Sequence, residues 1–117
     1  MLFRSLFSTG RDLAIFCRTL LAGGSYGPAR ILGADFVELM LTPPGLGFGV
    51  DQAWFMGELA GRGAVGHTGF TGTSVVLDPA TDTFLVLLAN TVHPRRRGAD
   101  SGPRAVAGTR VARAVWG

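Results

Sequence analysis

Residues 66–79 constrain this chain most, because glycine, histidine and hydroxyl side chains come first and β-branched ones follow. A turn rich in Pro, Asp and Thr comes next at 79–83, and the apolar run 84–89 follows it. Two extended segments around such a turn predict a β-hairpin, whose second, wholly apolar segment we expect to be buried on both faces. Gly69 and Gly72 interrupt the first segment, and glycine inside a strand often marks the close approach of a ligand or another backbone. We therefore interpret this stretch as the edge of a site.

The composition predicts one globular domain. A chain of 117 residues buries roughly 65% of the surface that its unfolded form exposes, and a hydrophobic content of 47% argues against disorder. The net charge is +3, and all 11 basic residues are arginines. Because the sequence contains no lysine, no reaction step carried by this chain can use a lysine base.

The sequence carries no marker of a compartment. Cys17 is the only cysteine, so no disulfide can form within the chain. Arg4, Arg11 and Asp12 interrupt the apolar N-terminus, which leaves no hydrophobic region of the signal-peptide type. No apolar run approaches the roughly 20 residues that span a bilayer. We expect a soluble chain with no signal peptide or membrane span, whose compartment the sequence does not identify.

Two helices are predicted ahead of the candidate site. The first begins at Ser8 or Thr9, and Thr9 with Asp12 has the form of a capping box. It ends at a Gly-Gly pair, as helices often do. The second spans 30–40 and stops before a Pro-Pro pair. The apolar residues with helical spacing are Leu13, Phe16, Cys17, Leu20 and Leu21 in the first helix and Leu32, Phe36, Leu39 and Met40 in the second.

The segment between the second helix and the candidate site gives weaker signals. Residues 45–51 alternate glycine with apolar side chains and suit a strand in a crowded place. Residues 52–65 resemble a connection of hairpin type, with Trp54 and Phe55 as its anchors. We therefore expect one more strand and then a loop before residue 66.

The C-terminal part of the chain predicts a link and a last helix. The charged segment 94–103 is interpreted as a flexible link, and 105–116 as a helix that Gly108 weakens. Val111 and Val115 lie on one side of this helix. We find no internal repeat and no boundary, so we expect residues 1–117 to belong to a single domain, or part of one, of the α+β class.

Two glycine motifs match the sequence patterns of known sites but lack the secondary structure that those sites need. Residues 23–27 fit G-x-S-x-G, but a nucleophile elbow needs a strand before it and a helix after it, whereas here a helix precedes and Pro28 follows. Residues 61–66 fit G-x-G-x-x-G, but a dinucleotide site needs a helix there, and the next residues predict a strand. We interpret the first as a helix exit and the second as a loop.

The remaining polar residues leave few other kinds of site. His67 and His93 are the only histidines, and no cysteine pair accompanies them, which argues against a zinc site. A lone histidine is more often structural than catalytic, and for His67, beside Thr68 and a glycine, we keep both readings open. Three arginines at 95–97 could contact phosphates, but no aromatic platform is expected near them, so we predict no nucleic-acid partner.

The order of these features resembles one family. The succession covers nearly the whole chain and resembles the C-terminal part of the β-lactamase-related serine hydrolases, which include class C-like β-lactamases, D-alanyl-D-alanine carboxypeptidases and esterases. The resemblance implies an α+β fold with antiparallel sheet strands and flanking helices, and it implies no metal or organic cofactor. It rests on the segments 6–13, 20–24, 31–40, 46–49, on Gly66-His67-Thr68-Gly69-Phe70-Thr71-Gly72-Thr73, on Asp78-Pro79 and on Leu87-Leu88-Ala89-Asn90.

The resemblance implies a role for each of four residues. His67-Thr68-Gly69 corresponds to the third family motif, Lys/His-Thr/Ser-Gly, on the strand beside the active site. In that motif His67 hydrogen-bonds towards the nucleophile, and the Thr68 hydroxyl meets the substrate, commonly a carboxylate. Gly69 lets an acyl substrate lie against the strand, and the backbone N–H of Phe70 is one of two oxyanion donors.

The other two family motifs are missing. In the first motif, S-x-x-K, the serine attacks and the lysine assists proton transfer. The nearest match is Ser8-Thr9-Gly10-Arg11, but arginine stays protonated and cannot act as a base. The second motif, Tyr/Ser-x-Asn, is absent as well, because Pro28 stands where asparagine should follow Tyr26.

We therefore expect the C-terminal part of a serine hydrolase, whether by truncation, a missed upstream start or gene decay. It is expected to be inactive alone, and to act on a small acyl substrate or peptide only when an N-terminal half completes it. Apolar surface left open by a missing half predicts self-association. The alternatives are a non-catalytic ligand- or partner-binding module derived from that fold, and an unrelated small α+β interaction domain.

Overall fold

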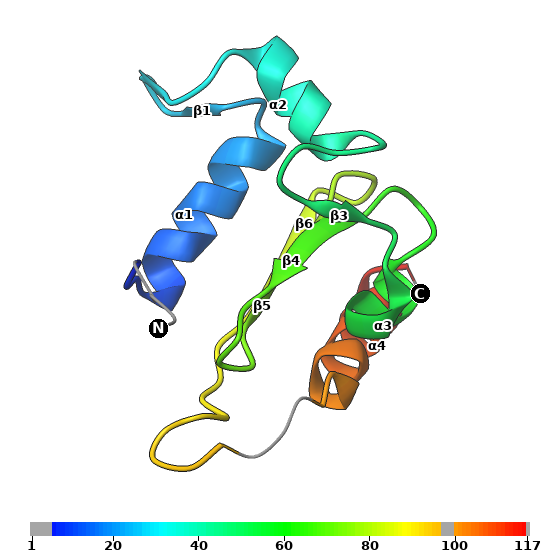
Figure 1. Ribbon diagram of the computed structural model, residues 1–117. Helices are drawn as coiled ribbons and strands as arrows, with labels where there is room; N and C mark the ends of the chain where they lie inside the picture. Colours follow the sequence, from blue (N-terminus) through cyan, green and yellow to red (C-terminus); the bar gives the residue numbers. More distant parts are fainter. Residues whose placement is uncertain (1–5, 97–99, 117) are drawn as a thin grey trace.

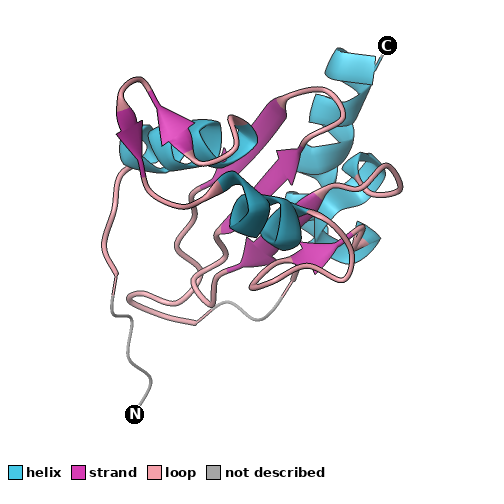
Figure 2. Ribbon diagram, turned by 90° about the horizontal axis from the view of Figure 1, so that it is seen from above, coloured by secondary structure: helices cyan, strands magenta, loops and turns pink. Residues whose placement is uncertain are grey.

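The computed structural model describes residues 6–96 and 100–116, and its centre is an antiparallel sheet of the order β3-β4-β5-β6 (Figure 1). Helices lie on both sides of this sheet (Figures 1 and 2). The predicted α+β class, with antiparallel strands and flanking helices, is confirmed. The strands of this sheet are β3 (Gly49–Val50), β4 (Val65–Thr68), β5 (Ser74–Asp78) and β6 (Thr83–Leu87). A separate small hairpin consists of β1 (Ser25–Tyr26) and β2 (Ala29–Arg30). The helices are α1 (Gly10–Leu21), α2 (Ala34–Leu41), α3 (Ala53–Met56), the 3-10 helix η1 (Gly57–Leu59) and α4 (Gly102–Trp116).

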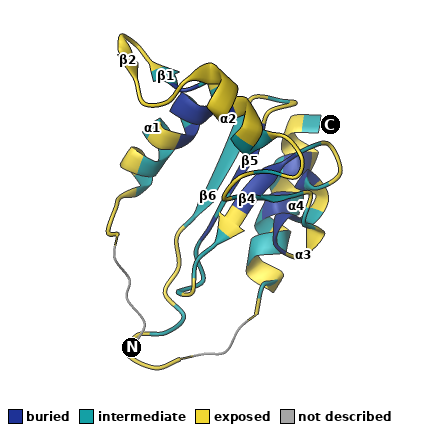
Figure 3. Cartoon of the chain, turned by 45° about the horizontal axis from the view of Figure 1, so that its top comes forward, coloured by how far each residue is buried: buried dark blue, intermediate teal, exposed yellow. Residues whose placement is uncertain are grey.

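Each face of the sheet has its own apolar core. Neighbouring residues of a strand point to opposite faces, so Val76 packs with α3 and α4 while Leu77 packs with α1 and α2. Figure 3 shows the buried segments where helices and strands face one another, and exposed residues over much of α2. The buried members are Phe55, Met56, Leu59, Ala64, Val76 and Ala112 in one core and Cys17, Leu20, Val37, Val65 and Leu77 in the other.

The first helix forms as its cap predicts. Thr9 is the N-cap, and its hydroxyl accepts a hydrogen bond from the backbone N–H of Asp12 at 3.1 Å. Arg18 then ties this helix to the turn between β5 and β6, because its guanidinium donates to the carboxylate and to the carbonyl of Asp82, each at 2.9 Å. Phe16 departs from the predicted apolar stripe, since 43% of it is exposed.

The second helix starts later than predicted and buries a different side. Residues 29–30 pair with β1 instead of joining α2, and this hairpin was not foreseen. Val37 is buried, whereas Phe36 and Leu39 are 60% and 54% exposed. The prediction is confirmed for Met40, which packs against the core, and was wrong for Phe36 and Leu39, because helical spacing identifies which residues share a face and the packing partner decides which face is covered.

Residues 45–65 also differ from the prediction. Only residues 49–50 of the expected strand pair with the sheet, and the expected hairpin-type connection is helical, forming α3 and η1. Phe55 anchors it as predicted, while Trp54 is 56% exposed. The loop that matches G-x-G-x-x-G binds a carboxylate of its own chain, because Asp51 accepts hydrogen bonds from the backbone N–H groups of residues 61, 63 and 64. The interpretation as a loop is confirmed for residues 61–64, whereas residues 65 and 66 already belong to β4.

The glycine-interrupted stretch is two strands, β4 and β5, joined by a turn at 69–73. Gly72 has a φ of 98°, a conformation that glycine adopts without strain, and so the chain reverses where a continuous strand was predicted. Both faces of strand β6 are covered by other elements as predicted, since Leu85 packs on one core and Phe84 and Val86 on the other, but its residues are only half-buried because β6 lies at the edge of the described sheet. Its apolar residues reflect contacts with α1 and α4 rather than a place inside the sheet.

The last helix is longer than predicted and packs closely on α3. Gly108 is buried, and a Cβ built on it would overlap the backbone carbonyl of Met56. The hydroxyl of Thr109 accepts a hydrogen bond from the N–H of Glu58, and Arg113 forms an ion pair with the same glutamate at 2.7 Å. In residues 6–96 and 100–116, no helix combines the length and apolar character needed to cross a bilayer.

Candidate functional site

The sequence-predicted site residues lie together at the end of β4 and in the turn that follows. Strand β3 pairs with β4 only at residues 65 and 66, whereas β5 pairs with all four residues of β4. Within the described chain, therefore, no strand covers the β3 side of His67 and Thr68. Gly69 donates its N–H towards β5, to the carbonyl of Thr73, so by strand alternation the N–H and carbonyl of Thr68 point to the open side.

His67 is exposed and its orientation is set by the next residue. The ring Nδ1 lies 2.7 Å from the carbonyl oxygen of Thr68. Because a carbonyl only accepts hydrogen bonds, Nδ1 is the nitrogen that carries the hydrogen. In the neutral ring Nε2 is then the hydrogen-bond acceptor.

The turn after β4 is held by its own backbone. Gly69 donates to the carbonyl of Thr73 at 2.8 Å, and Gly72 donates to the carbonyl of Gly69 at 3.1 Å. A Cβ at Gly69 would overlap the hydroxyl of Thr73. Residue 69 is therefore glycine for a local reason that the sequence did not suggest, because Thr73 fills the space that a side chain at position 69 would need.

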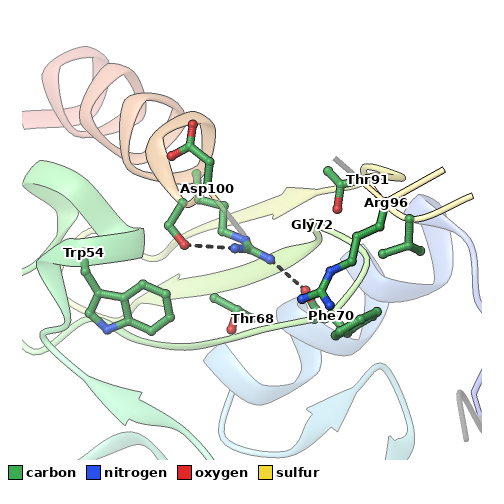
Figure 4. A pocket seen from close by; sticks show the side chains of 11 residues that line it. Trp54, Thr68, Phe70, Gly72, Thr91, Arg96 and Asp100 are labelled. Carbon is green, nitrogen blue, oxygen red and sulfur yellow. Dashed lines mark hydrogen bonds between the residues drawn. The ribbon is translucent and has the colours of Figure 1, made fainter. Parts of the chain in front are cut away.

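A cavity of about 470 Å³ opens beside this turn (Figure 4). Trp54 stands at one side of it and Phe70 at the other, where the guanidinium of Arg96 lies 5.0 Å from the centre of the Phe70 ring. The expectation that no aromatic ring lies near the arginines of 95–97 was wrong for Arg96, because the fold brings the link back over the turn. The lining residues are Trp54, Thr68, Gly69, Phe70, Gly72, Thr91, Val92, Arg96, Asp100, Ser101 and Arg104.

A second hollow, of about 300 Å³, lies on the β3 side of the same strand end. Trp54 and Thr68 line both hollows, whereas His67 lines only this one. The end of β4 thus separates two spaces, with His67 facing one and Phe70 facing the other. An extended ligand along the open edge of β4 would contact both.

The fold does not bring the imitations of the first two family motifs to this site. Ser8 and Arg11 lie at the start of α1, where Thr9 acts as a helix cap, and Tyr26 lies on β1. None of them lines either hollow. Among the described residues, no group of three or more His, Cys, Asp or Glu side chains is placed to hold a metal ion.

Sequence reasoning missed Arg104. Its guanidinium reaches the turn from α4 and donates to the carbonyl of Gly69 at 2.7 Å and to that of Thr73 at 3.1 Å. These partners lie 35 and 31 residues earlier in the chain. No local pattern signals a contact of that range, and the link before α4 was predicted to be flexible.

Comparison with known proteins gives consistent matches. Residues 3–109 match the model of the family described as Beta-lactamase. The chain is 37% identical over 98 residues to a protein of Escherichia coli K12 named putative D-alanyl-D-alanine carboxypeptidase, and 33% identical over 98 residues to a protein of Bacillus subtilis 168 named N-acetylmuramyl-L-alanine amidase. These matches cover 75% of this chain but 23% and 22% of the two relatives. The chain thus spans less than a quarter of the length of the curated relatives it matches.

Proposed function

This chain belongs to the β-lactamase family of serine hydrolases, and from that premise we propose that it supplies the third-motif strand of an acyl pocket. The proposed reaction is hydrolysis of an amide, lactam or ester carbonyl through an acyl-enzyme. The observation that carries the proposal is the open edge of β4, where His67, Thr68 and Phe70 meet two adjoining hollows.

Each residue of this edge has a proposed task. An acyl group lies along β4 as an added strand, with the N–H of Thr68 as a donor and its carbonyl, which also accepts from the ring of His67, as an acceptor. The Thr68 hydroxyl meets a polar group of the substrate, and Nε2 of His67 faces the attacking hydroxyl and its proton. The N–H of Phe70 donates to the oxygen that becomes negative in the tetrahedral intermediate.

We further propose that the chain alone does not form an acyl-enzyme. The family's S-x-x-K motif needs a lysine, and this sequence has none. Arg11 of the nearest imitation lies on α1 and lines neither hollow. The nucleophile and base are therefore assigned to a polypeptide segment outside these 117 residues, which would supply the attacking group to the open edge.

A non-catalytic module is the second candidate. The cavity of about 470 Å³ is formed wholly by this chain, with aromatic side chains and two arginines in its lining. Such a cavity fits a small acyl ligand or a peptide end without any nucleophile. Ligand binding without covalent capture is the property that would favour this candidate.

Two experiments test the proposal. The pure 117-residue protein is treated with a fluorophosphonate and with a labelled penicillin, and we expect neither to modify a serine. A chimera is then made in which this chain replaces the matched segment of the E. coli relative, and hydrolysis of a D-alanyl-D-alanine peptide and of an activated ester is measured. We expect activity in the chimera and a loss of about 100-fold in kcat for His67→Ala, the size typical of a lost acid–base group.

Each experiment has an outcome that would contradict the proposed function. Covalent labelling of the isolated chain would contradict the assignment of the nucleophile to another segment. A folded chimera without activity, together with non-covalent binding of the peptide by the isolated chain, would favour the binding module. Arg110→Ala, an exposed change on the outer side of α4, is the matched control for the chimera.

A further inference from the structure

Arg104 joins the last helix to the turn that ends the third-motif strand. It lies in the first helical turn of α4, half-buried, and all three of its side-chain nitrogens are engaged. Nε donates to the carbonyl of Thr73 at 3.1 Å, Nη2 to the carbonyl of Gly69 at 2.7 Å, and Nη1 to the hydroxyl of Ser101 at 2.9 Å.

The two carbonyls are the two ends of the turn. Gly69 and Thr73 already share a backbone hydrogen bond, so a planar guanidinium that binds both oxygens fixes the separation and the direction of the turn ends. Only arginine offers rigidly spaced donors of this kind, whereas a lysine ammonium is a point charge on a flexible stem. Ser101 holds the guanidinium from its other side and keeps it in the plane that both bonds need.

The carbonyl of Gly69 and the N–H of Phe70 belong to one peptide unit. Cis peptide bonds of the described chain occur at Pro43-Pro44 and His93-Pro94, so this unit is trans. In a planar trans peptide the C=O and the N–H point in opposite directions. A guanidinium that holds the oxygen on one side therefore sets the direction of the N–H on the other, and the positive charge at the oxygen makes that N–H a stronger donor.

We infer that Arg104 is a positioning residue that aims and polarises the Phe70 N–H through the carbonyl of Gly69. The inference rests on the proposed function, in which that N–H meets the developing oxyanion. Docking of α4 through Arg104 is then a condition for a competent acyl pocket, although α4 itself offers no group to the reaction.

The first test uses the 117-residue protein and nuclear magnetic resonance. In the wild type, the Arg104 Nε–H is expected to exchange slowly and to show a coupling through the hydrogen bond to the carbonyl carbon of Thr73. In Arg104→Gln, we expect the carbonyl carbon of Gly69 and the amide proton of Phe70 both to move upfield. Exchange of the Gly69 and Gly72 amides should quicken by about tenfold or more, as the loss of a charge-assisted hydrogen bond implies.

The control is Arg110→Gln, which removes the same charge from the exposed side of the same helix. It should leave the signals of residues 69–73 in place. If the two variants have equal effects on those signals, or if the wild type lacks both the slow exchange and the coupling, the inference is overturned. The wild-type measurement can overturn the inference even if Arg104→Gln does not fold.

The second test uses the chimera that contains this chain. Arg104→Gln should lower kcat by about 10- to 100-fold with little change in KM, because an oxyanion donor acts mainly in the transition state. Arg104→Lys should recover part of the loss, since it can reach one carbonyl. An inactive wild-type chimera would count against the proposed function alone, whereas an active one in which Arg104→Gln matches Arg110→Gln would overturn the positioning role.

Discussion

Replacing Gly108 by alanine separates two opposite expectations for the last helix. Intrinsic helix propensity favours alanine over glycine by about 1 kcal/mol in a helix interior, so the sequence alone predicts a more stable protein. In the structure a Cβ at this position overlaps the backbone carbonyl of Met56, and the neighbouring Ala112 is buried against the same core. The helices α3 and α4 must therefore separate to admit one methyl group.

The size of the destabilisation by Gly108→Ala depends on which atoms the added methyl group meets. Overpacking a core costs typically 1–3 kcal/mol, and we take about 3 kcal/mol because the obstructing atoms are backbone and cannot turn aside. Subtracting the gain of about 1 kcal/mol in propensity leaves a predicted net loss of about 2 kcal/mol in the free energy of unfolding. Urea unfolding followed by circular dichroism measures this loss as a lower midpoint at an unchanged slope.

The control is Gly10→Ala, the first residue of α1, where a Cβ would meet only ordinary contact at 3.6 Å with a methyl group of Leu88. It should be neutral or slightly stabilising. A Gly108→Ala protein as stable as the wild type, or more stable, would refute the close packing of α3 on α4.

Three further predictions concern stability. The hydrogen bond from Arg113 lowers the pKa of Glu58, so this pair stabilises the fold above the ordinary carboxyl pKa, and its contribution is lost as the pH falls through the lowered value. In Arg113→Ala, the urea midpoint should therefore fall less on acidification than it does in the wild type. An equal fall in both proteins would contradict the pairing. Thr9→Ala should cost about 1 kcal/mol of unfolding free energy by removing the cap of α1, whereas Thr9→Ser should cost little. Burial raises the pKa of the Cys17 thiol, so iodoacetamide should modify the native protein no faster than the protein unfolds, and rapid alkylation under native conditions would argue against the packing of α1.

A candidate site could be predicted from the sequence because its residues are consecutive. Gly66 to Thr73 carry the family pattern in one run, and the structure brings this run to an open strand edge beside two hollows. The role of its residues stays a prediction. The turn within the run was missed because the β-branched residues after it hid the reversal at Gly72, whose positive φ is a property of the folded backbone.

The sequence did not predict the other residues that line the cavity beside the candidate site. Arg104 and Arg96 fall in or near a segment that composition describes as a charged link, and Trp54 in one that predicted a loop. All three reach the cavity through contacts between residues far apart in the chain. Such contacts depend on how the helices dock on the sheet, and no local spacing encodes that.

Local sequence was enough to predict the α+β class, the cap and end of α1, the last helix, the loop at 61–64 and the family. These features depend on residues within a few positions of one another, or on a contiguous motif, so local chemistry fixes them. The folded arrangement was needed to learn which side of α2 is covered, why residue 108 is glycine, that β6 is an edge strand of the described sheet, and that Arg104 holds the turn after β4. Each of these depends on burial against a distant segment, and the free energy of burial belongs to both partners of a contact.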